Sequence, residues 1–410
     1  MQFPNILPKQ LFYVKPPRKV LILISVFLVA VVFGETVIFF KIQSNSILNF
    51  PTDTPTPVMI GTVSDLGIPT IPVKILKPCF QDGKSMIARG APNNKFGMYM
   101  VIDASTLPVE TQMHDISKLV NSNGGDWGYV LTQMYLQDLN QSRWEKFFAL
   151  ASEYHLTPII QLMTNTFDYG VMETQLKENA LFLNSINWPT SCRYVSVFNE
   201  VNAKEYWGDK IDPEGYALML GKTIDIYKNE NVDFFILNGS FNSSARTSAW
   251  YLDEEEYLKR MENAQPGIFK RIDGWASHPY PQPGFSGDYY NPPSWYGVRD
   301  QIKNYTWEAE LLQIYADVSG LPVFFTETGW AHQEGNNPQP EYKSSIVTAK
   351  YFDDAYRNIW LPDPNVKAII PFIYYLPGWD NFNWLSIEGK CYQQCNVVTA
   401  IPKTIGVPEW

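Results

Sequence analysis

The stretch PVFFTETGW, from Pro322 to Trp330, begins as an apolar run and reaches an acidic side chain, Glu327, with no turn residue before it. A short continuous apolar run is typical of a strand that is buried on both faces. A lone glutamate at the end of such a run is most often a solvated loop residue. Glu327 therefore indicates a function only if the rest of the chain supplies a partner for it.

Seven other short apolar runs resemble this one and are separated by longer amphipathic stretches. They are FGMYMVI (96–102), WGYVLTQM (127–134), TPIIQLM (157–163), YVSVFNE (194–200), FFILNG (234–239), GWASHPY (274–280) and AIIPFIYY (368–375). The intervening stretches carry apolar residues three and four positions apart, as helices do. Strand and helix alternating eight times predict an α/β fold, the (β/α)8 TIM barrel. A doubly wound open sheet is the competing architecture, but no G-x-G-x-x-G follows the first run.

The N-terminal part of the chain predicts export and attachment to a membrane. Residues 20–40 are apolar apart from one Gly-Glu-Thr triplet, and a helix of this length spans a bilayer. The basic residues of 1–19 place that end in the cytoplasm and the rest of the chain outside. Cleavage of a signal peptide after Gly34 is the alternative, and we favour the uncleaved anchor. Residues 41–75, rich in proline and threonine, predict an extended linker, and residues 76–410 the barrel domain.

Composition bears on partners and on the cysteines. A formal net charge of -10, with no stripe of lysine and arginine beyond the N-terminus, argues against nucleic acid. Cys79 and Cys192 are isolated in the sequence, whereas Cys391 and Cys395 form a pair that fits a local disulfide, free thiols or half of a zinc site. No second cysteine pair and no paired histidines complete such a zinc site, so no metal is expected.

The ends of the runs supply the candidate site, because in a barrel the C-terminal ends of the strands converge on one mouth. Glu200 ends the fourth run and Glu327 the seventh, so the two acids face each other across that mouth. Two such carboxyl groups suit cleavage of a glycosidic bond, since one protonates the leaving oxygen and the other supports the positive carbon. The other strand-end residues are candidate sugar contacts: Asn165, Asn199, Asn238, His278, Tyr280, Trp379 and Trp384.

Each of these contacts also has a plain structural interpretation. A tryptophan offers a flat face to a sugar ring, yet a single tryptophan packs over a barrel rim about as often. His278 fits a core histidine bonded to backbone, but it alternates with Tyr280 and so shares its face of the strand. Tyr280 can donate to a carboxylate, and Asn199 to a sugar hydroxyl.

The segments FNE (198–200), SHPY (277–280) and FFTETGW (324–330) resemble, in this order, the retaining glycoside hydrolases of clan A. This superfamily includes the family 5 cellulases and mannanases, the family 17 glucanases and the family 39 xylosidases, and the resemblance covers about 95–384. It implies that Glu200 is the acid/base and that Glu327 is the nucleophile that forms a glycosyl-enzyme. It further implies a β-linked carbohydrate as substrate and no cofactor.

The resemblance also implies roles for the sugar contacts. Asn199 would bind the 2-hydroxyl group, and His278 and Tyr280 would lie beside the reacting sugar. A tryptophan after the eighth strand would support the ring, with Trp384 preferred to Trp379.

Three features depart from the clan's pattern. Val201 and Asn202 follow Glu200 where proline or glycine is frequent, and no arginine ends the second run as it does in family 5. The tail after 368–375 offers no clear eighth helix, so the segment before the first strand is expected to cover that gap.

The long loop 281–297 carries tyrosines and tryptophans that fit either a sugar cleft or packing on the barrel top.

Other classes of function fit less well. A metal-dependent hydrolase would need clustered ligands, yet the four histidines show no H-x-H or H-E-x-x-H spacing. The serine hydrolase motif G-x-S-x-G is absent. The remaining alternative is a non-catalytic, cell-surface carbohydrate-binding barrel, against which the presence of both Glu200 and Glu327 argues.

Overall fold

All eight apolar runs form strands in the computed structural model, and every pairing between them is parallel. The strands are β3 (Gly97–Tyr99), β4 (Gly128–Tyr135), β5 (Leu156–Met163), β6 (Arg193–Val197), β7 (Phe234–Leu237), β8 (Trp275–Ser277), β9 (Val323–Thr328) and β10 (Val366–Pro371). Strands β3 to β7 pair in chain order in one sheet, and β8 to β10 in another. Parallel bridges join β7 to β8 through Leu237 and Gly274, and Phe96 to Ile369 of β10. The strand pairing thus runs from β3 to β10 and returns to the residue that precedes β3.

The structure describes three stretches of the chain: 77–102, 105–288 and 297–408. The predicted cytoplasmic segment 1–19, membrane helix 20–40 and linker 41–75 lie outside them, as do 289–296 of the aromatic loop. Within the described stretches, no helix is both long and apolar enough to cross a bilayer. The predictions for the N-terminal segments therefore stay predictions.

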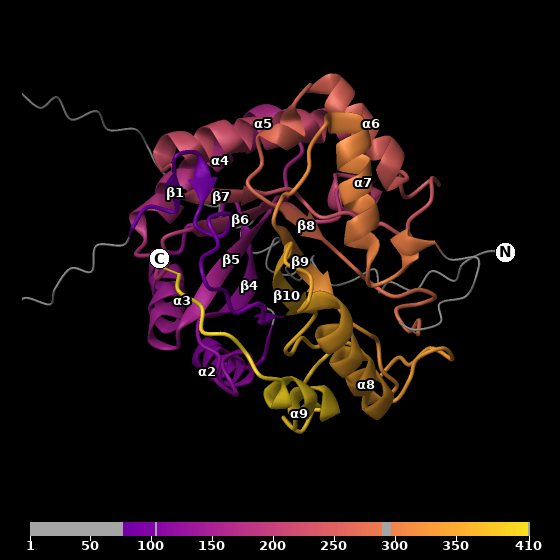
Figure 1. Cartoon of the computed structure of the whole chain (residues 1–410). Coiled ribbons are helices and arrows are strands. Elements are labelled where there is room, and N and C mark those ends of the chain that lie inside the picture. Colours follow the sequence, from indigo (N-terminus) through magenta and orange to yellow (C-terminus); the bar gives the residue numbers. More distant parts are fainter. Residues whose placement is uncertain (1–76, 103–104, 289–296, 409–410) are drawn as a thin grey trace, which may run out of the picture. The chain divides into compact units, whose positions relative to one another are not determined.

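A helix follows each of these eight strands, and the helices surround the strands (Figure 1). They are α2 (Val109–Val120), α3 (Gln141–Glu153), α4 (Tyr169–Ser185), α5 (Pro213–Glu230), α6 (Glu254–Ala264), α7 (Asn304–Ala316), α8 (Ser345–Ala355) and α9 (Gln393–Ala400). Helix α9 corrects the sequence prediction that the tail lacks an eighth helix, and it packs between α8 and α2. Its apolar pattern is faint because it buries only two apolar side chains, Cys395 and Val398.

Side chains alternate along the strands between two apolar clusters. Ile159 and Phe324 belong to a cluster formed by strand residues and by the segment that precedes β3. Their chain neighbours Ile160 and Phe325 belong to a second cluster, which also contains the apolar faces of the helices. Each strand is therefore buried on both faces, and full burial of one such side chain contributes about 1.5–3 kcal/mol. This double burial explains why the runs are continuously apolar instead of alternating.

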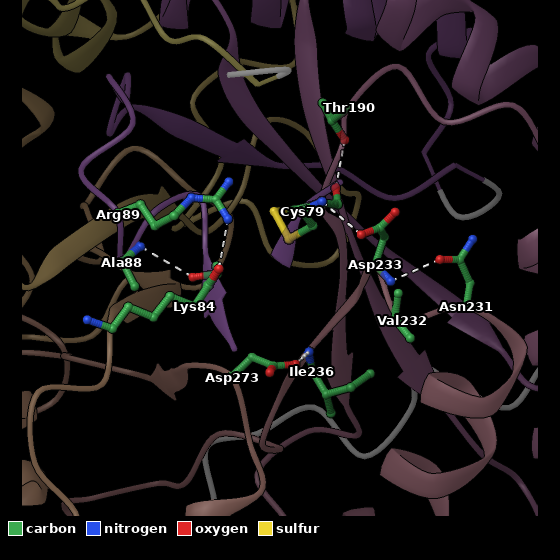
Figure 2. Close-up of a disulfide and its surroundings, with 12 residues drawn as sticks. Cys79, Lys84, Ala88, Arg89, Thr190, Asn231, Val232, Asp233, Ile236 and Asp273 are labelled. Atoms are coloured by element: carbon green, nitrogen blue, oxygen red, sulfur yellow. Dashed lines mark hydrogen bonds between the residues drawn. A yellow bond between two sulfur atoms is a disulfide. The ribbon is translucent and has the colours of Figure 1, made fainter. Parts of the chain in front are cut away.

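The segment before β3 covers the N-terminal ends of the strands. It contains the hairpin β1 (Phe80–Gln81) and β2 (Lys84–Ser85), and a disulfide links Cys79 to Cys192 at the start of β6. The backbone nitrogen of Cys79 also donates to Oδ1 of Asp233, 2.7 Å away (Figure 2). Cys79 and Cys192 are isolated in the sequence, and the sequence analysis did not pair them, but these residues 113 positions apart meet at this end.

The second cysteine pair, Cys391 and Cys395, is also joined by a disulfide. This is the local bridge among the alternatives that the sequence allowed. It links Cys391, two positions before α9, to the first turn of that helix.

Candidate active site

Glu200 and Glu327 lie at the C-terminal ends of β6 and β9, and one histidine nitrogen contacts both. Nδ1 of His278 is 3.2 Å from Oε1 of Glu200 and 3.8 Å from Oε2 of Glu327. These two oxygens are therefore at most about 7 Å apart, the sum of the two distances. The fold thus brings together the two acids that the sequence placed at strand ends, with the predicted His278 between them.

The chain leaves β6 through a strained turn that positions Glu200. Phe198 has φ 74° and Glu200 has φ 37°, a region that non-glycine residues enter at a cost of about 1–3 kcal/mol each. The side chain of Asn202 holds the turn in place, because its amide nitrogen donates to the carbonyl oxygens of Asn242 and Leu252 and its oxygen accepts from the nitrogen of Asn242. The strained backbone and the hydrogen bonds of Asn202 therefore lie at the candidate acid Glu200, whose position they fix.

The surroundings of Glu327 bring its pKa close to neutrality. Burial raises the pKa of this carboxyl to about 7, and the charge of Glu200 acts in the same direction. The charge of His278 and the hydroxyl of Tyr280, which donates to Oε2 from 3.0 Å, oppose that rise. A carboxyl poised near pH 7 is suited to acid, base or nucleophilic chemistry.

His278 is itself completely buried at its side chain. Burial lowers the pKa of its imidazole, but the charges of Glu327 and Glu200 outweigh this effect and the net pKa is raised. Its second ring nitrogen, Nε2, is buried and has no hydrogen-bond partner among the described residues. The ring therefore favours its cationic form and keeps one nitrogen that no described protein group occupies.

Asn199 is held by a chain of buried polar groups that the sequence analysis missed. Tyr99 at the end of β3 donates to Oε1 of Gln161 at 2.8 Å, and Nε2 of Gln161 donates to Oδ1 of Asn199 at 3.0 Å. Because its oxygen is taken, the amide nitrogen of Asn199 is the group left to donate. Gln161 was detectable in principle, since it is a polar residue inside the apolar run TPIIQLM.

Two further tyrosines border the acids and were also missed. Burial and the charge of Glu200 raise the pKa of Tyr206 and of Tyr251, and the charge of Glu327 also acts on Tyr206. Both lie in the connections after β6 and β7, where an antiparallel bridge pairs Ala203 with Tyr251. Loop residues of this kind carry no periodic signal, so nothing in the sequence singled them out.

The two tryptophans predicted after the eighth strand lie in different environments. Trp384 is 1% exposed and packs against Phe352 of α8, with ring centroids 5.2 Å apart, in the cluster between strands and helices. Trp379 is half-buried and packs edge-on to Phe382, which in turn contacts Tyr280. The structure therefore connects Trp379, and not the preferred Trp384, to the aromatic side of the site.

Two predicted contacts, Asn238 and Asn165, make no hydrogen bond to either acid within the described stretches. Asn238 uses its side chain in the seam between β7 and β8: Oδ1 accepts from the nitrogen of Ala276 and Nδ2 donates to the carbonyl oxygens of Ala276 and Gly239. Asn165 is exposed in the connection after β5. Trp330 is buried and donates to the carbonyl oxygen of Gly287 at 2.9 Å.

The described residues show no metal cluster, and one described cavity lies away from the two acids. Among the described stretches, no group of three histidine, cysteine, aspartate or glutamate side chains could hold a metal ion. A cavity of about 230 Å³ lies between α7 and the N-terminal ends of β8 and β9, and its lining includes Trp275, Leu312 and Val323. Neither acid of the pair belongs to the lining of this cavity.

Comparison with known proteins yields a likeness of fold. No family model and no curated protein sequence matches the chain. A glucosidase from Croceicoccus marinus is similar in structure, with a TM-score of 0.51 and 9% identity over 75% of this chain and 67% of that one. A GH128 (subgroup II) endo-β-1,3-glucanase from Sorangium cellulosum gives 0.48 and 11%, over 75% of this chain and 98% of that one.

A GH2 β-galacturonidase from Eisenbergiella tayi gives a TM-score of 0.48 and 13% identity over 79% of this chain, which spans about half, 52%, of that protein. Of the three structures, the glucosidase alone exceeds a TM-score of 0.5. At such identities the similarity shows the fold, and the residues of the site must carry the function.

Proposed function

We propose that this chain is a retaining glycoside hydrolase built on a (β/α)8 barrel, acting on a β-linked poly- or oligosaccharide. The observation that carries the proposal is the contact of one imidazole nitrogen, Nδ1 of His278, with both Glu200 and Glu327. The circuit of eight parallel strands supports the barrel, and the likeness to a glucosidase fold supports the general class.

The reaction follows two displacements at the anomeric carbon. In the first, Glu200 gives its proton to the glycosidic oxygen while the carboxylate of Glu327 attacks the carbon, so the sugar becomes an ester of Glu327 and the alcohol leaves. In the second, Glu200 takes a proton from water, the water oxygen attacks the same carbon, and Glu327 is released. Both residues end as they began, and the configuration at the carbon is retained.

The neighbouring groups fit these roles. The hydroxyl of Tyr280 donates to Oε2 of Glu327, which favours the ionised nucleophile. The oxygen of Asn199 accepts from Gln161, and its amide nitrogen would donate to a sugar hydroxyl. The separation of at most about 7 Å between the contacting oxygens includes the 5–5.5 Å typical of retaining enzymes and excludes most of the range of about 6.5–9.5 Å found in inverting enzymes.

A non-catalytic carbohydrate-binding protein is the alternative from another class. Sugar binding alone requires neither a carboxyl with a pKa near 7 nor a histidine shared by two acids. Burying two acids and one histidine together costs folding free energy, and a catalytic role would explain why the chain buries them. Binding of a glycan without release of product would favour this alternative.

We also propose that the barrel faces an oxidising compartment, in line with the membrane segment predicted at 20–40. Both disulfides support this, because such bridges persist mainly outside the cytoplasm. Mass spectrometry of the native protein after thiol alkylation, with and without reduction, tests it. Alkylation of all four cysteines without reduction would contradict the proposal.

Trapping of the covalent intermediate tests the proposed reaction. A 2-deoxy-2-fluoro β-glycoside with a good leaving group should add one sugar to the wild-type chain, on the peptide that contains Glu327. Glu327→Gln should show no adduct, and both it and Glu200→Gln should lose at least about 10²-fold in turnover of unactivated glycosides. Glu310→Gln, an exposed position of α7, is the matched control and should behave as wild type. Hydrolysis without an adduct and with inverted product would contradict the double displacement.

A further inference from the structure

Gln161 is a fully buried polar side chain within an apolar strand. It belongs to β5, where its chain neighbours Ile160 and Leu162 are apolar and equally buried. Burying an amide costs free energy unless its hydrogen bonds are made, and an apolar residue of similar size could fill the position without that cost. The presence of an amide here therefore calls for a reason other than packing.

Gln161 and Tyr99 lie on the same face of the strands. The period of two places Gln161 on the face of β5 that carries Ile159, and Ile159 belongs to the same apolar cluster as Tyr99. Tyr99 pairs with Leu131 of β4, which in turn pairs with Ile159. Gln161 is thus two residues closer than this row to the C-terminal end of β5, the end of the strands at which the two acids lie.

The amide of Gln161 is bonded at both of its ends. Its Oε1 accepts from the hydroxyl of Tyr99 at 2.8 Å, and its Nε2 donates to Oδ1 of Asn199 at 3.0 Å. Tyr99 and Gln161 are 0% exposed and Asn199 is 7% exposed, so water competes little for these bonds. Because Asn199 directly precedes Glu200, this polar relay of Tyr99, Gln161 and Asn199 ends beside the candidate acid.

The direction of the bonds in the polar relay is set at Tyr99. Burial and the charge of Glu327 raise the pKa of its hydroxyl well above the usual value, so the hydroxyl keeps its proton. A hydrogen bond with Gln133 lowers this pKa, as a bond donated to the phenol oxygen does, which leaves the hydroxyl proton for Gln161. An amide donates only through its nitrogen and accepts only through its oxygen. Gln161 must then turn its nitrogen toward Asn199, and Asn199 its oxygen toward Gln161.

We propose that Tyr99 and Gln161 are positioning residues that hold the oxygen of Asn199 inward, so that its amide nitrogen meets the substrate and selects a sugar position that carries a hydrogen-bond acceptor. The consequence for the substrate rests on the proposed function, whereas the direction of the amide does not. Without its two partners the amide of Asn199 is free to turn over and present its oxygen instead. Loss of either partner should therefore weaken recognition of one sugar hydroxyl and leave the others unaffected.

Hydrogen exchange measured by NMR tests the polar relay without any substrate. In the full-length chain with ¹⁵N-glutamine, the side-chain amide protons of Gln161, identified by their absence in Gln161→Leu, should exchange slowly with D2O. In Tyr99→Phe they should exchange about fivefold faster, because one neutral hydrogen bond is lost. Tyr129→Phe is the matched control, since this buried hydroxyl donates to Oδ1 of Asn93 at 2.6 Å near the opposite end of the strands, and it should change nothing.

Labelling with ¹⁵N-asparagine tests the direction of the last bond. The side-chain amide protons of Asn199, identified by their absence in Asn199→Asp, should exchange faster than those of Gln161, because they point away from the relay. If Asn199 were turned the other way, its nitrogen would donate to Gln161 and its protons would be the protected ones. Slow exchange at Asn199, or fast exchange at Gln161 in the wild type, would overturn the proposal.

Kinetics with deoxy sugars test the consequence for the substrate. The best substrate among the 4-nitrophenyl β-D-glucoside, galactoside, mannoside and xyloside is compared with its monodeoxy analogues. Asn199→Ala identifies the position that this side chain contacts, because the preference for hydroxyl over hydrogen falls there. Tyr99→Phe and Gln161→Leu should lower that preference about fivefold at the same position and at no other, and Tyr129→Phe should lower it at none.

The outcomes separate the polar relay from the proposed function. If the chain hydrolyses no glycoside, the proposed function fails, while the exchange rates still decide the direction of Asn199. An equal loss of kcat/KM on all analogues in both Tyr99→Phe and Gln161→Leu would mean a merely structural role and would overturn the proposal. If Tyr99→Phe does not fold, Gln161→Leu decides alone, because leucine suits an apolar strand.

Discussion

Replacing Tyr280 by phenylalanine tests the assignment of Glu327 as the nucleophile, because it removes only the hydroxyl that donates to Oε2 from 3.0 Å. A hydrogen bond to a charged group contributes about 1.5–3 kcal/mol, and this one favours the ionised carboxyl. One pKa unit corresponds to about 1.4 kcal/mol, so Tyr280→Phe should raise the pKa of Glu327 by roughly one to two units. The starting value is about 7.

The sign of the change follows from the role. A nucleophile must be ionised, so kcat/KM of the wild type should rise with pH through about 7 and then level off. In Tyr280→Phe, the same rise should lie at higher pH. Below both pKa values, the variant should therefore retain roughly a tenth to a hundredth of the wild-type kcat/KM.

The assay is the pH profile of kcat/KM for an aryl β-glycoside whose leaving group needs no proton, so that Glu200 does not limit the rate. Tyr305→Phe is the matched control, since it removes a tyrosine hydroxyl that donates to Oδ2 of Asp363 at the same distance, 3.0 Å. The reasoning is refuted if the rise stays in place in Tyr280→Phe or moves as far in Tyr305→Phe. A wild-type activity that falls as pH passes through 7 would assign the proton donor to Glu327 instead.

Three further predictions concern the supporting structure. Replacing Cys79 and Cys192 by serine opens a link between residues 113 positions apart and should lower the free energy of unfolding by about 5 kcal/mol in denaturant titrations. Trp384→Ala should lower it by about 3–5 kcal/mol because it empties a fully buried position, whereas Trp379→Ala should chiefly raise KM in glycoside kinetics. Asn238→Ala should cost about 1–3 kcal/mol in thermal or chemical unfolding with KM unchanged, since its amide bonds only to backbone.

The strands could be predicted because their environment leaves a plain trace in the sequence. Burial on both faces produces continuous apolar runs, and the helices between them produce a different period. The ends of the strands were less accessible: the run 194–200 was expected to continue to Glu200, yet β6 stops at Val197. The strand ends early because the backbone turns with positive φ at Phe198 and Glu200. Phenylalanine and glutamate are not residue types that indicate such a turn in a sequence.

The site was predictable where chain order alone decides position. The ends of two parallel strands must reach the same edge, so Glu200 and Glu327 could be paired without knowing any contact. Asn199 and Asn238 show the limit, because both are asparagines at strand ends. Asn199 accepts from Gln161 through its oxygen, whereas Asn238 bonds with both ends of its amide to the backbone of Gly239 and Ala276. Only the partners distinguish them, and those are far away in sequence.

The charge balance of the site explains why the tyrosine that donates to Glu327 is a suitable partner for it. Burial raises the pKa of Tyr280, so this residue stays a neutral donor to Glu327 at ordinary pH. A lysine or arginine in its place would add a second cation and lower the pKa of Glu327 far below neutrality. With His278 as the single imidazolium beside two carboxyl groups, the pair can keep a proton near pH 7. Double displacement requires this proton count, because one carboxyl must give a proton while the other attacks without one.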